Sequence, residues 1–265
     1  MHAFNYHRPA SSKDAVSLSS KNAEGRYLAG GQSLVQAMKL RLSSPTDLID
    51  LGTIKDLAGI KVSGSTVEIG AMTRHADVAA SAEVKKAIPA LAALAAMIGD
   101  RQVRHMGTIG GSLANNDPAA DYPAAALGLG ATITTNKRKI EADKFFAGLY
   151  ETALEPGELI TSVSFPAPKR AAYMKFKNPA SRFAIVGVFV ADFSGKVRVG
   201  VTGAGPSAFR QADMEKALSA KFAPESVANM KVKADGLNND LHASPEYRAH
   251  LVTVMAKRAV EAALK

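Results

Sequence analysis

Apolar residues repeat at helical spacing after the first thirty residues of the chain, between two segments that are typical of short strands. A face with an apolar residue at every fourth position predicts a helix over 33–42, through Leu34, Met38 and Leu42. Strands are expected before this helix over 26–29 and after it over 47–51. Residues 1–55 are therefore predicted to form a compact α/β unit.

From residue 56 the pattern changes to strands with helical insertions. Apolar and polar residues alternate on both sides of 63–66, which is typical of a hairpin of strands 60–62 and 67–69. Thr73 is expected to cap a helix that runs through Val78. The other elements expected in this part are a helix from Pro89 to about Gly99, a helix over 124–129 and a strand over 131–135.

The clearest linker signal in the chain is Pro166-Ala167-Pro168. Beyond it, alternation predicts three antiparallel strands over 173–177, 184–193 and 196–202, followed by helices. Ser244 before Pro245 is typical of an N-cap, so the last helix is expected to begin there. The predicted organisation is an N-terminal α/β lobe over 1–55, a middle α+β lobe over 56–168, and a C-terminal sheet with a helical bundle over 169–265.

Composition narrows the chemistry that the chain can carry. Its 265 residues include no cysteine, which excludes disulfides, thiolate zinc sites, cysteine nucleophiles and cysteine-ligated iron–sulfur clusters within this chain. No metal site is predicted. Any redox chemistry is therefore expected to come from a bound organic cofactor.

The formal net charge is +9, but the basic residues stand in short groups in separate segments. This dispersion favours a solvated basic surface over a nucleic-acid site. The N-terminal residues lack the apolar core of a secretory signal, and the longest apolar-rich stretch, 89–98, is too short to span a membrane. The protein is predicted to be soluble and cytoplasmic, with no nucleic-acid partner and no membrane span.

Histidine and serine patterns indicate no hydrolytic or metal centre. The six histidines lack H-x-x-x-H and H-E-x-x-H spacing, and His105 is notable only because it precedes a glycine doublet. No serine lies in a G-x-S-x-G elbow. We predict no catalytic residue in this chain.

Two glycine doublets carry the strongest functional signal. Gly30-Gly31 precedes Gln32-Ser33, and Gly110-Gly111 lies between Thr108-Ile109 and Ser112. Bare backbone N–H groups beside a hydroxyl residue favour an anion, and two such segments together suggest a ligand with two linked phosphates. Neither segment fits a P-loop or a G-x-G-x-x-G fingerprint, so the residues predict an unusual dinucleotide site without identifying the ligand.

The segment that follows the second doublet is rich in carboxylate and amide oxygens. It lacks the residue order of a calcium loop, so calcium is not expected. Asp121 is instead predicted to accept hydrogen bonds from a ribose or ribityl hydroxyl.

With these residues assembled, the chain resembles the FAD-binding medium subunits of the molybdenum hydroxylases, the family of carbon monoxide dehydrogenase, and is similar to the flavin domain of xanthine dehydrogenase. The family's A-G-G-x-S and T-I-G-G-[NS] motifs match Ala29–Ser33 and Thr108–Ser112. Further matching segments follow in order along the chain: Phe4–Pro9, Ile69–Thr73, Asn116–Asp121, Glu155–Ile160, Glu246–Arg248 and Arg258–Val260.

The resemblance implies a p-cresol methylhydroxylase-type FAD-binding α+β fold, with a C-terminal three-stranded antiparallel sheet and a helical bundle. It implies noncovalent FAD, with its pyrophosphate on both glycine segments and its ring near the strand before the linker and the first C-terminal strand. The residues assigned to FAD are Leu28, Ala29, Gly30, Gly31, Gln32, Ser33, Leu34, Thr108, Ile109, Gly110, Gly111, Ser112, Asn116, Asp121, Leu159, Ile160, Lys177 and Phe183. Two of them depart from the family pattern: Gln32 stands where some relatives have histidine, and Phe183 where many have tyrosine.

The resemblance also implies a division of labour among subunits. A molybdenum large subunit would oxidise the substrate, an iron–sulfur small subunit would relay electrons, and this chain would pass them through FAD to an acceptor. The expected assembly is a dimer of heterotrimers. Two alternatives stay open: a self-contained FAD-dependent reductase and a non-catalytic nucleotide-binding interaction protein.

Overall fold

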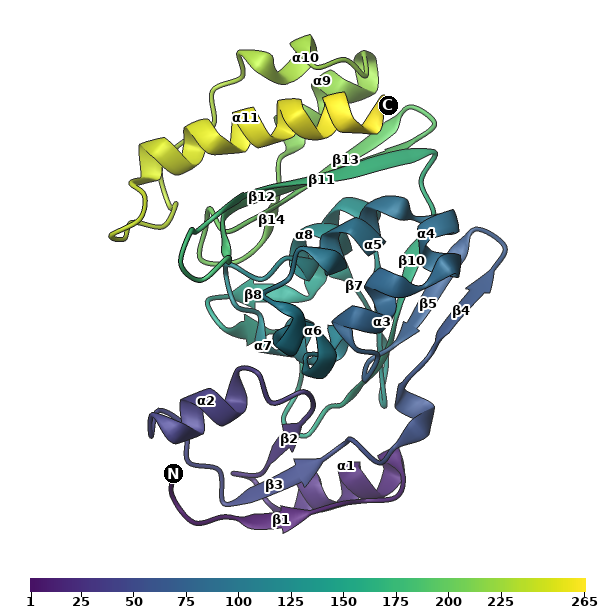
Figure 1. The fold of residues 1–265 in the computed structure, drawn as a ribbon, viewed down its shortest axis with the longest axis vertical. Coiled ribbons are helices and arrows are strands. Elements are labelled where there is room, and N and C mark those ends of the chain that lie inside the picture. Colours follow the sequence, from purple (N-terminus) through teal and green to yellow (C-terminus); the bar gives the residue numbers. More distant parts are fainter.

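Three main β-sheets follow one another along the chain and stack along the long axis of the molecule (Figure 1), and a fourth sheet has only two short strands. The computed structural model describes all residues from 1 to 265. No helix in it combines the length and the apolar character that crossing a membrane would require.

The first sheet is parallel, in the order β1-β3-β2. Its strands are β1 (Asn5–His7), β2 (Arg26–Leu28) and β3 (Asp47–Asp50), accompanied by α1 (Ser12–Lys21) and α2 (Leu34–Lys39). The predicted strands are confirmed. A small core that includes Ala15 and Ile49 also takes in Leu159 from the middle of the chain.

Helix α2 is shorter than the apolar spacing predicts. It ends at Lys39 because Arg41 adopts a left-handed conformation with φ of 60°. The N–H groups of Arg41 and Leu42 then donate to Met38 O at 3.1 Å and Ala37 O at 2.9 Å, the pairing of a Schellman motif. Leu42 is consequently 79% exposed, and the predicted apolar face extends only to Met38.

The middle sheet is antiparallel in the order β4-β5-β10-β6-β7. Its strands are β4 (Ile60–Ser63), β5 (Thr66–Gly70), β6 (Thr132–Thr135), β7 (Lys139–Glu141) and β10 (Ile160–Pro166). The predicted hairpin and the strand after 131 are confirmed. Short elements beside the sheet are the 3₁₀ turns η1 (Lys55–Leu57) and η2 (Ala142–Lys144) and the paired strands β8 (Phe146–Gly148) and β9 (Glu151–Thr152).

Six short helices accompany the middle sheet: α3 (His75–Ala80), α4 (Ala82–Ala87), α5 (Pro89–Ala96), α6 (Arg101–Met106), α7 (Ile109–Asn115) and α8 (Tyr122–Leu129). The Pro89 start is confirmed. The Thr73 cap is wrong: α3 begins at His75 without a side-chain cap, and Thr73 Oγ1 instead bonds both the N–H and the carbonyl of Gly59 at 3.0 Å. Thr73 therefore joins the segment after β5 to Gly59, just before β4, rather than starting a helix.

The third sheet is antiparallel, with β11 (Arg170–Lys177), β12 (Ala184–Phe193), β13 (Lys196–Thr202) and β14 (Phe209–Arg210) in that order. The three predicted strands are confirmed, and two-residue β14 adds a short edge. Helix α11 (Pro245–Ala263) contacts β11 and β12, with α9 (Ala212–Ala220) and α10 (Glu225–Ala228) nearby (Figure 1). Ser244 caps α11 as predicted, because its Oγ accepts from Tyr247 N at 3.3 Å.

Helix α8 packs directly against β12 and β13, so the third sheet and the middle unit share one core. Gly200 allows this close approach, since a Cβ there would lie 2.2 Å from Ala124 O. Tyr173, Phe189 and Ala191 of the third sheet belong to the same buried cluster as the middle sheet. The segment between β10 and β11 therefore links two sheets that are continuous in their packing.

Candidate functional site

A cavity of about 1070 Å³ lies among the three sheets. The part of the chain around the first sheet contributes Tyr27 and the first glycine segment. The part around the middle sheet contributes α6, α7 and the 155–160 turn, and the third sheet contributes Lys175 and the 180–183 turn. The volume lies at the upper end of the range of small-molecule and cofactor sites. All three units are needed to form its wall.

The two glycine segments, far apart in sequence, meet at this cavity. A Cβ on Gly30 would lie only 2.1 Å from Met106 O and 2.7 Å from the Cα of Gly107. Any larger residue at position 30 would push the segments apart. The predicted proximity of the two segments is thus built into their backbone packing.

The first glycine segment offers free backbone donors. The N–H groups of Gly30, Gly31, Gln32 and Ser33 form no hydrogen bond within the chain, and Gly31 is left-handed with φ of 70°. Ser33 precedes α2 but makes no side-chain cap bond, which leaves its hydroxyl free as well. Successive unpaired N–H groups around a left-handed glycine form a concave anion site.

The second glycine segment differs from its prediction. It is the first turn of α7, and its N–H groups already have partners: Ile109 donates to Thr73 O at 3.1 Å, Gly110 to Ala71 O at 2.8 Å, and Gly111 to Thr108 Oγ1 at 3.1 Å. Its glycines serve close packing, because a Cβ on Gly110 would lie 2.5 Å from the Ala71 Cβ. The segment supplies a close-packed wall and the Ser112 side chain rather than free backbone donors.

Asp121 lies at the cavity wall, buried, with both carboxylate oxygens in use. Lys175 Nζ donates to Oδ2 at 2.9 Å, and the Tyr173 hydroxyl donates to Oδ1. Burial raises the pKa of Asp121, and the charge of Lys175 opposes that rise. Lys175 Nζ has a second acceptor in Met97 O at 3.3 Å. A carboxylate oxygen can accept more than one bond, so a ligand hydroxyl can still share this group.

Most of the predicted site residues line the cavity. They are Ala29, Gly30, Gly31, Gln32, Ser33, Leu34, Thr108, Gly110, Gly111, Ser112, Asp121, Leu159, Ile160 and Phe183. Gln32 folds back on its own turn, where Nε2 donates to Gly30 O at 3.2 Å. Phe183 is 48% exposed at the cavity rim.

Leu28, Ile109, Asn116 and Lys177 do not line the cavity. Ile109 is fully buried in the core, and Leu28 packs behind Gly31. Asn116 ends α7 in a left-handed conformation and donates from Nδ2 to Gly148 O and Glu151 O at 2.8 and 2.7 Å. It therefore braces the β8–β9 hairpin from inside the protein.

Lys177 is displaced by an irregularity in its strand. Alternation alone would place Lys175 and Lys177 on the same face of β11, but the pairing with β12 shifts register between Phe176 and Lys177. The side chain of Lys175 is 1% exposed and lines the cavity, whereas Lys177 is exposed at the strand end. Lys175 is the lysine that sequence reasoning missed; its i, i+2 spacing from Tyr173 was the available signal.

The 155–158 turn was matched only as a motif, and the structure shows how it is held. Glu158 accepts from Arg138 at 3.0 Å, from Glu155 N at 2.8 Å and from the Thr135 hydroxyl at 2.7 Å. Burial alone would raise the pKa of Glu158, but these bonds lower it to about 2. The ionised carboxylate fixes the turn that carries Leu159 and Ile160 to the cavity.

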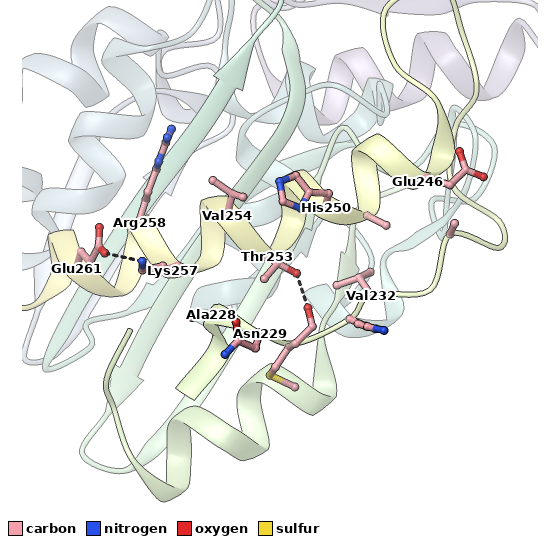
Figure 2. A pocket seen from close by; sticks show the side chains of 14 residues that line it. Ala228, Asn229, Val232, Glu246, His250, Thr253, Val254, Lys257, Arg258 and Glu261 are labelled. Carbon is pink, nitrogen blue, oxygen red and sulfur yellow. Dashed lines mark hydrogen bonds and ion pairs between the residues drawn. The ribbon is translucent and has the colours of Figure 1, made fainter. Parts of the chain in front are cut away.

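A second hollow of about 750 Å³ lies between α11 and the 228–234 segment (Figure 2). Its charges are mixed: Lys257 lies 3.8 Å from Glu261, and Thr253 donates to Met230 O at 2.8 Å. None of the predicted site residues lines it. No group of three or more histidine, cysteine or acidic side chains is placed to hold a metal ion. The cavity among the three sheets is therefore the candidate site.

The cavity residues fit a dinucleotide, since free N–H groups suit phosphate and the buried Asp121 suits a sugar hydroxyl. Comparison with known proteins agrees. Residues 2–168 match the family model described as FAD binding domain in molybdopterin dehydrogenase. The carbon monoxide dehydrogenase medium chain of Hydrogenophaga pseudoflava is 35% identical, over 98% of this chain and 96% of its own. The nicotine 6-hydroxylase medium subunit of Paenarthrobacter nicotinovorans is also 35% identical, over 97% and 96%.

Solved structures agree with the sequence comparisons. Reconstituted carbon monoxide dehydrogenase from Oligotropha carboxidovorans superposes with a TM-score of 0.91 at 35% identity, covering 99% of this chain and 98% of the other. Quinoline 2-oxidoreductase from Pseudomonas putida 86 gives a TM-score of 0.88 at 27% identity, with 99% and 97% covered. The predicted fold and family are thereby confirmed. The chain belongs to the family of FAD-binding domains of molybdopterin dehydrogenases.

Proposed function

We propose that this chain is the FAD-carrying electron-transfer subunit of a molybdenum hydroxylase. FAD, when bound, supplies the ability to take up electrons one at a time and to release them as a pair. The observation that carries the proposal is the cavity between three sheets, with four unpaired N–H groups on its first glycine segment.

The chain's own residues would bind and orient the cofactor. The N–H groups from Gly30 to Ser33 would hold the pyrophosphate, and the packed turn at Gly110 would form the opposite wall. Asp121, fixed by Lys175, would accept from a sugar hydroxyl. Leu159, Ile160 and Phe183 would contact the flavin ring and limit its access to water.

We further propose an iron–sulfur small subunit and a molybdenum large subunit as partners, in a dimer of heterotrimers. The cysteine-free sequence supports this, since iron–sulfur clusters then have to be held by another chain. Lobes over 1–55, 56–168 and 169–265, and a cytoplasmic location, belong to the same proposal. The external acceptor and the substrate of the large subunit are properties of the assembled complex.

The first test is the visible spectrum of the purified chain and a titration of the deflavinated protein with FAD. We expect the bands of oxidised flavin and one FAD per chain. A colourless protein that binds no added FAD would refute the proposal.

The second test concerns the partners. The complex purified through a tag on this chain is expected to contain iron and molybdenum, and the separated chain neither metal. A metal-free preparation that reduces an organic substrate with electrons from NADH would instead support the self-contained reductase. A chain that binds FAD but shows no reduction of the flavin in the complex would support the non-catalytic alternative.

A further inference from the structure

His75, the first residue of α3, is a cavity residue without an assigned role. The residue is only 5% exposed. Its backbone N–H donates to Gly107 O at 3.0 Å, which fixes α3 beside the end of α6. Its ring lies 5.3 Å from the ring of Tyr122, tilted by 49°.

The imidazole has no hydrogen-bond partner in the protein. Nδ1 is completely buried and unpaired, and no group of the chain bonds Nε2. A neutral imidazole carries its proton on one of the two nitrogens. A sealed, unpaired N–H would be unfavourable at Nδ1, so the proton belongs on Nε2.

Gly107 leaves room for that nitrogen. A Cβ at position 107 would lie 2.6 Å from Nε2 and 2.8 Å from Cδ2 of His75. Gly107 also lines the cavity and contacts Gly30, so Nε2 lies next to the seam where the two glycine segments meet. The unpaired Nε2–H of His75 therefore has no acceptor in the chain, and a ligand in the cavity can supply one.

We propose that the Nε2–H of His75 donates a hydrogen bond to a pyrophosphate oxygen of bound FAD. This inference rests on the proposed function and adds a donor that the glycine motifs do not contain. It also compensates for the second glycine segment, whose backbone N–H groups are already paired.

Before a ligand binds, the ring is in its neutral form. Burial, and then the positive charge of Arg104 on α6, lower the pKa of His75 to about 4. The other titratable group against the ring is Tyr122 on α8, whose pKa burial raises, so it stays uncharged. In the ligand-free chain the ring is therefore neutral at pH 8, and it enters the contact as an N–H donor.

The test compares His75→Leu with His75→Gln, whose amide nitrogen can take the place of Nε2. FAD and ADP are titrated into the deflavinated proteins at pH 8. We expect His75→Leu to weaken both ligands about tenfold or more, as for a lost hydrogen bond to a charged group, and His75→Gln to lie within about threefold of the wild type. Circular dichroism melting checks that both variants fold.

Unchanged FAD affinity in a folded His75→Leu would overturn the inference. A variant with lower affinity for FAD but unchanged affinity for ADP would overturn it as well. If the wild type itself binds no FAD, the proposed function fails first.

A measurement on the wild type avoids the folding question. In protein labelled with ¹⁵N-histidine, ADP is expected to shift the Nε2 signal of His75, identified by its absence in His75→Gln. No shift on saturation with ADP would likewise overturn the inference.

Discussion

Removing the charge of Lys175 should destabilise the protein in a way that depends on pH. Lys175 and Asp121 form an ion pair at 2.9 Å with side-chain exposures of 1% and 4%. In Lys175→Met the carboxylate of Asp121 keeps the Tyr173 hydroxyl but loses its compensating charge. Breaking a buried pair by deleting one partner costs about 3–5 kcal/mol, since an uncompensated charge stays buried.

The sign of the pH dependence follows from Asp121. Its folded-state pKa is raised above the ordinary value of 3.8, so the folded protein binds this proton more tightly than the unfolded chain. Ionisation of such a carboxyl group lowers the free energy of unfolding of the protein as pH rises from 3.8 through the folded-state pKa. Lys175→Met removes the charge that opposes the rise, so the loss becomes larger and extends to higher pH.

Urea denaturation of the deflavinated wild type and variant at pH 5 and pH 8 measures this effect. We expect a deficit of about 3–5 kcal/mol at pH 8 and a smaller one at pH 5. The double variant Lys175→Met/Asp121→Asn should regain most of the deficit, because no buried charge is left unpaired. Equal deficits at both pH values, or a double variant no more stable than Lys175→Met, would refute this account.

Three further changes test other parts of the structure. Gly30→Ala places a Cβ 2.1 Å from Met106 O and should cost about 1–3 kcal/mol and most of the FAD affinity in a fluorescence titration, whereas Gly64→Ala, in open space, should leave the affinity unchanged. Glu158→Gln should lower stability by roughly 3 kcal/mol at pH 7, the equivalent of a pKa lowered from 4.5 to about 2, and urea unfolding should show that gap closing as pH falls from 4.5 towards 2. Arg248→Met removes a buried guanidinium with three hydrogen-bond partners and should cost about 3 kcal/mol in thermal unfolding; a loss below 1 kcal/mol would contradict its structural role.

Elements with local signals were predictable from the sequence. The hairpin of β4 and β5, the Pro89 start and the Ser244 cap all depend on residues within a few positions of one another. Helix α7 was missed as a helix because adjacent glycines weaken helix propensity. It forms through the Thr108 cap and through the contact of Gly110 with Ala71. That contact joins residues distant in sequence, so no local pattern could indicate it.

The candidate site shows the same division. The composition of the first glycine segment predicted its free backbone donors, whereas the N–H groups of Ile109 and Gly110 in the second are taken up by residues distant in sequence, Thr73 and Ala71. The pairing of Asp121 with Lys175 joins residues that no local pattern relates, and the choice of Lys175 over Lys177 depends on a register shift visible only in the paired strands. His75 was missed because the absence of hydrogen-bond partners for its ring is visible only in the folded structure.

The core shared by the middle unit and the third sheet sets the order in which the protein can mature. Tyr173 and Phe189 complete the packing of the middle sheet, and Lys175 and Phe183 complete the cavity wall. All of them leave the ribosome after the 2–168 segment that carries the family match. A nascent chain that ends before β11 would have both glycine segments but no closed site. Cofactor loading then has to follow the synthesis of β11 and β12, and the acquired colour of the flavin would report that the third sheet has docked on the middle one.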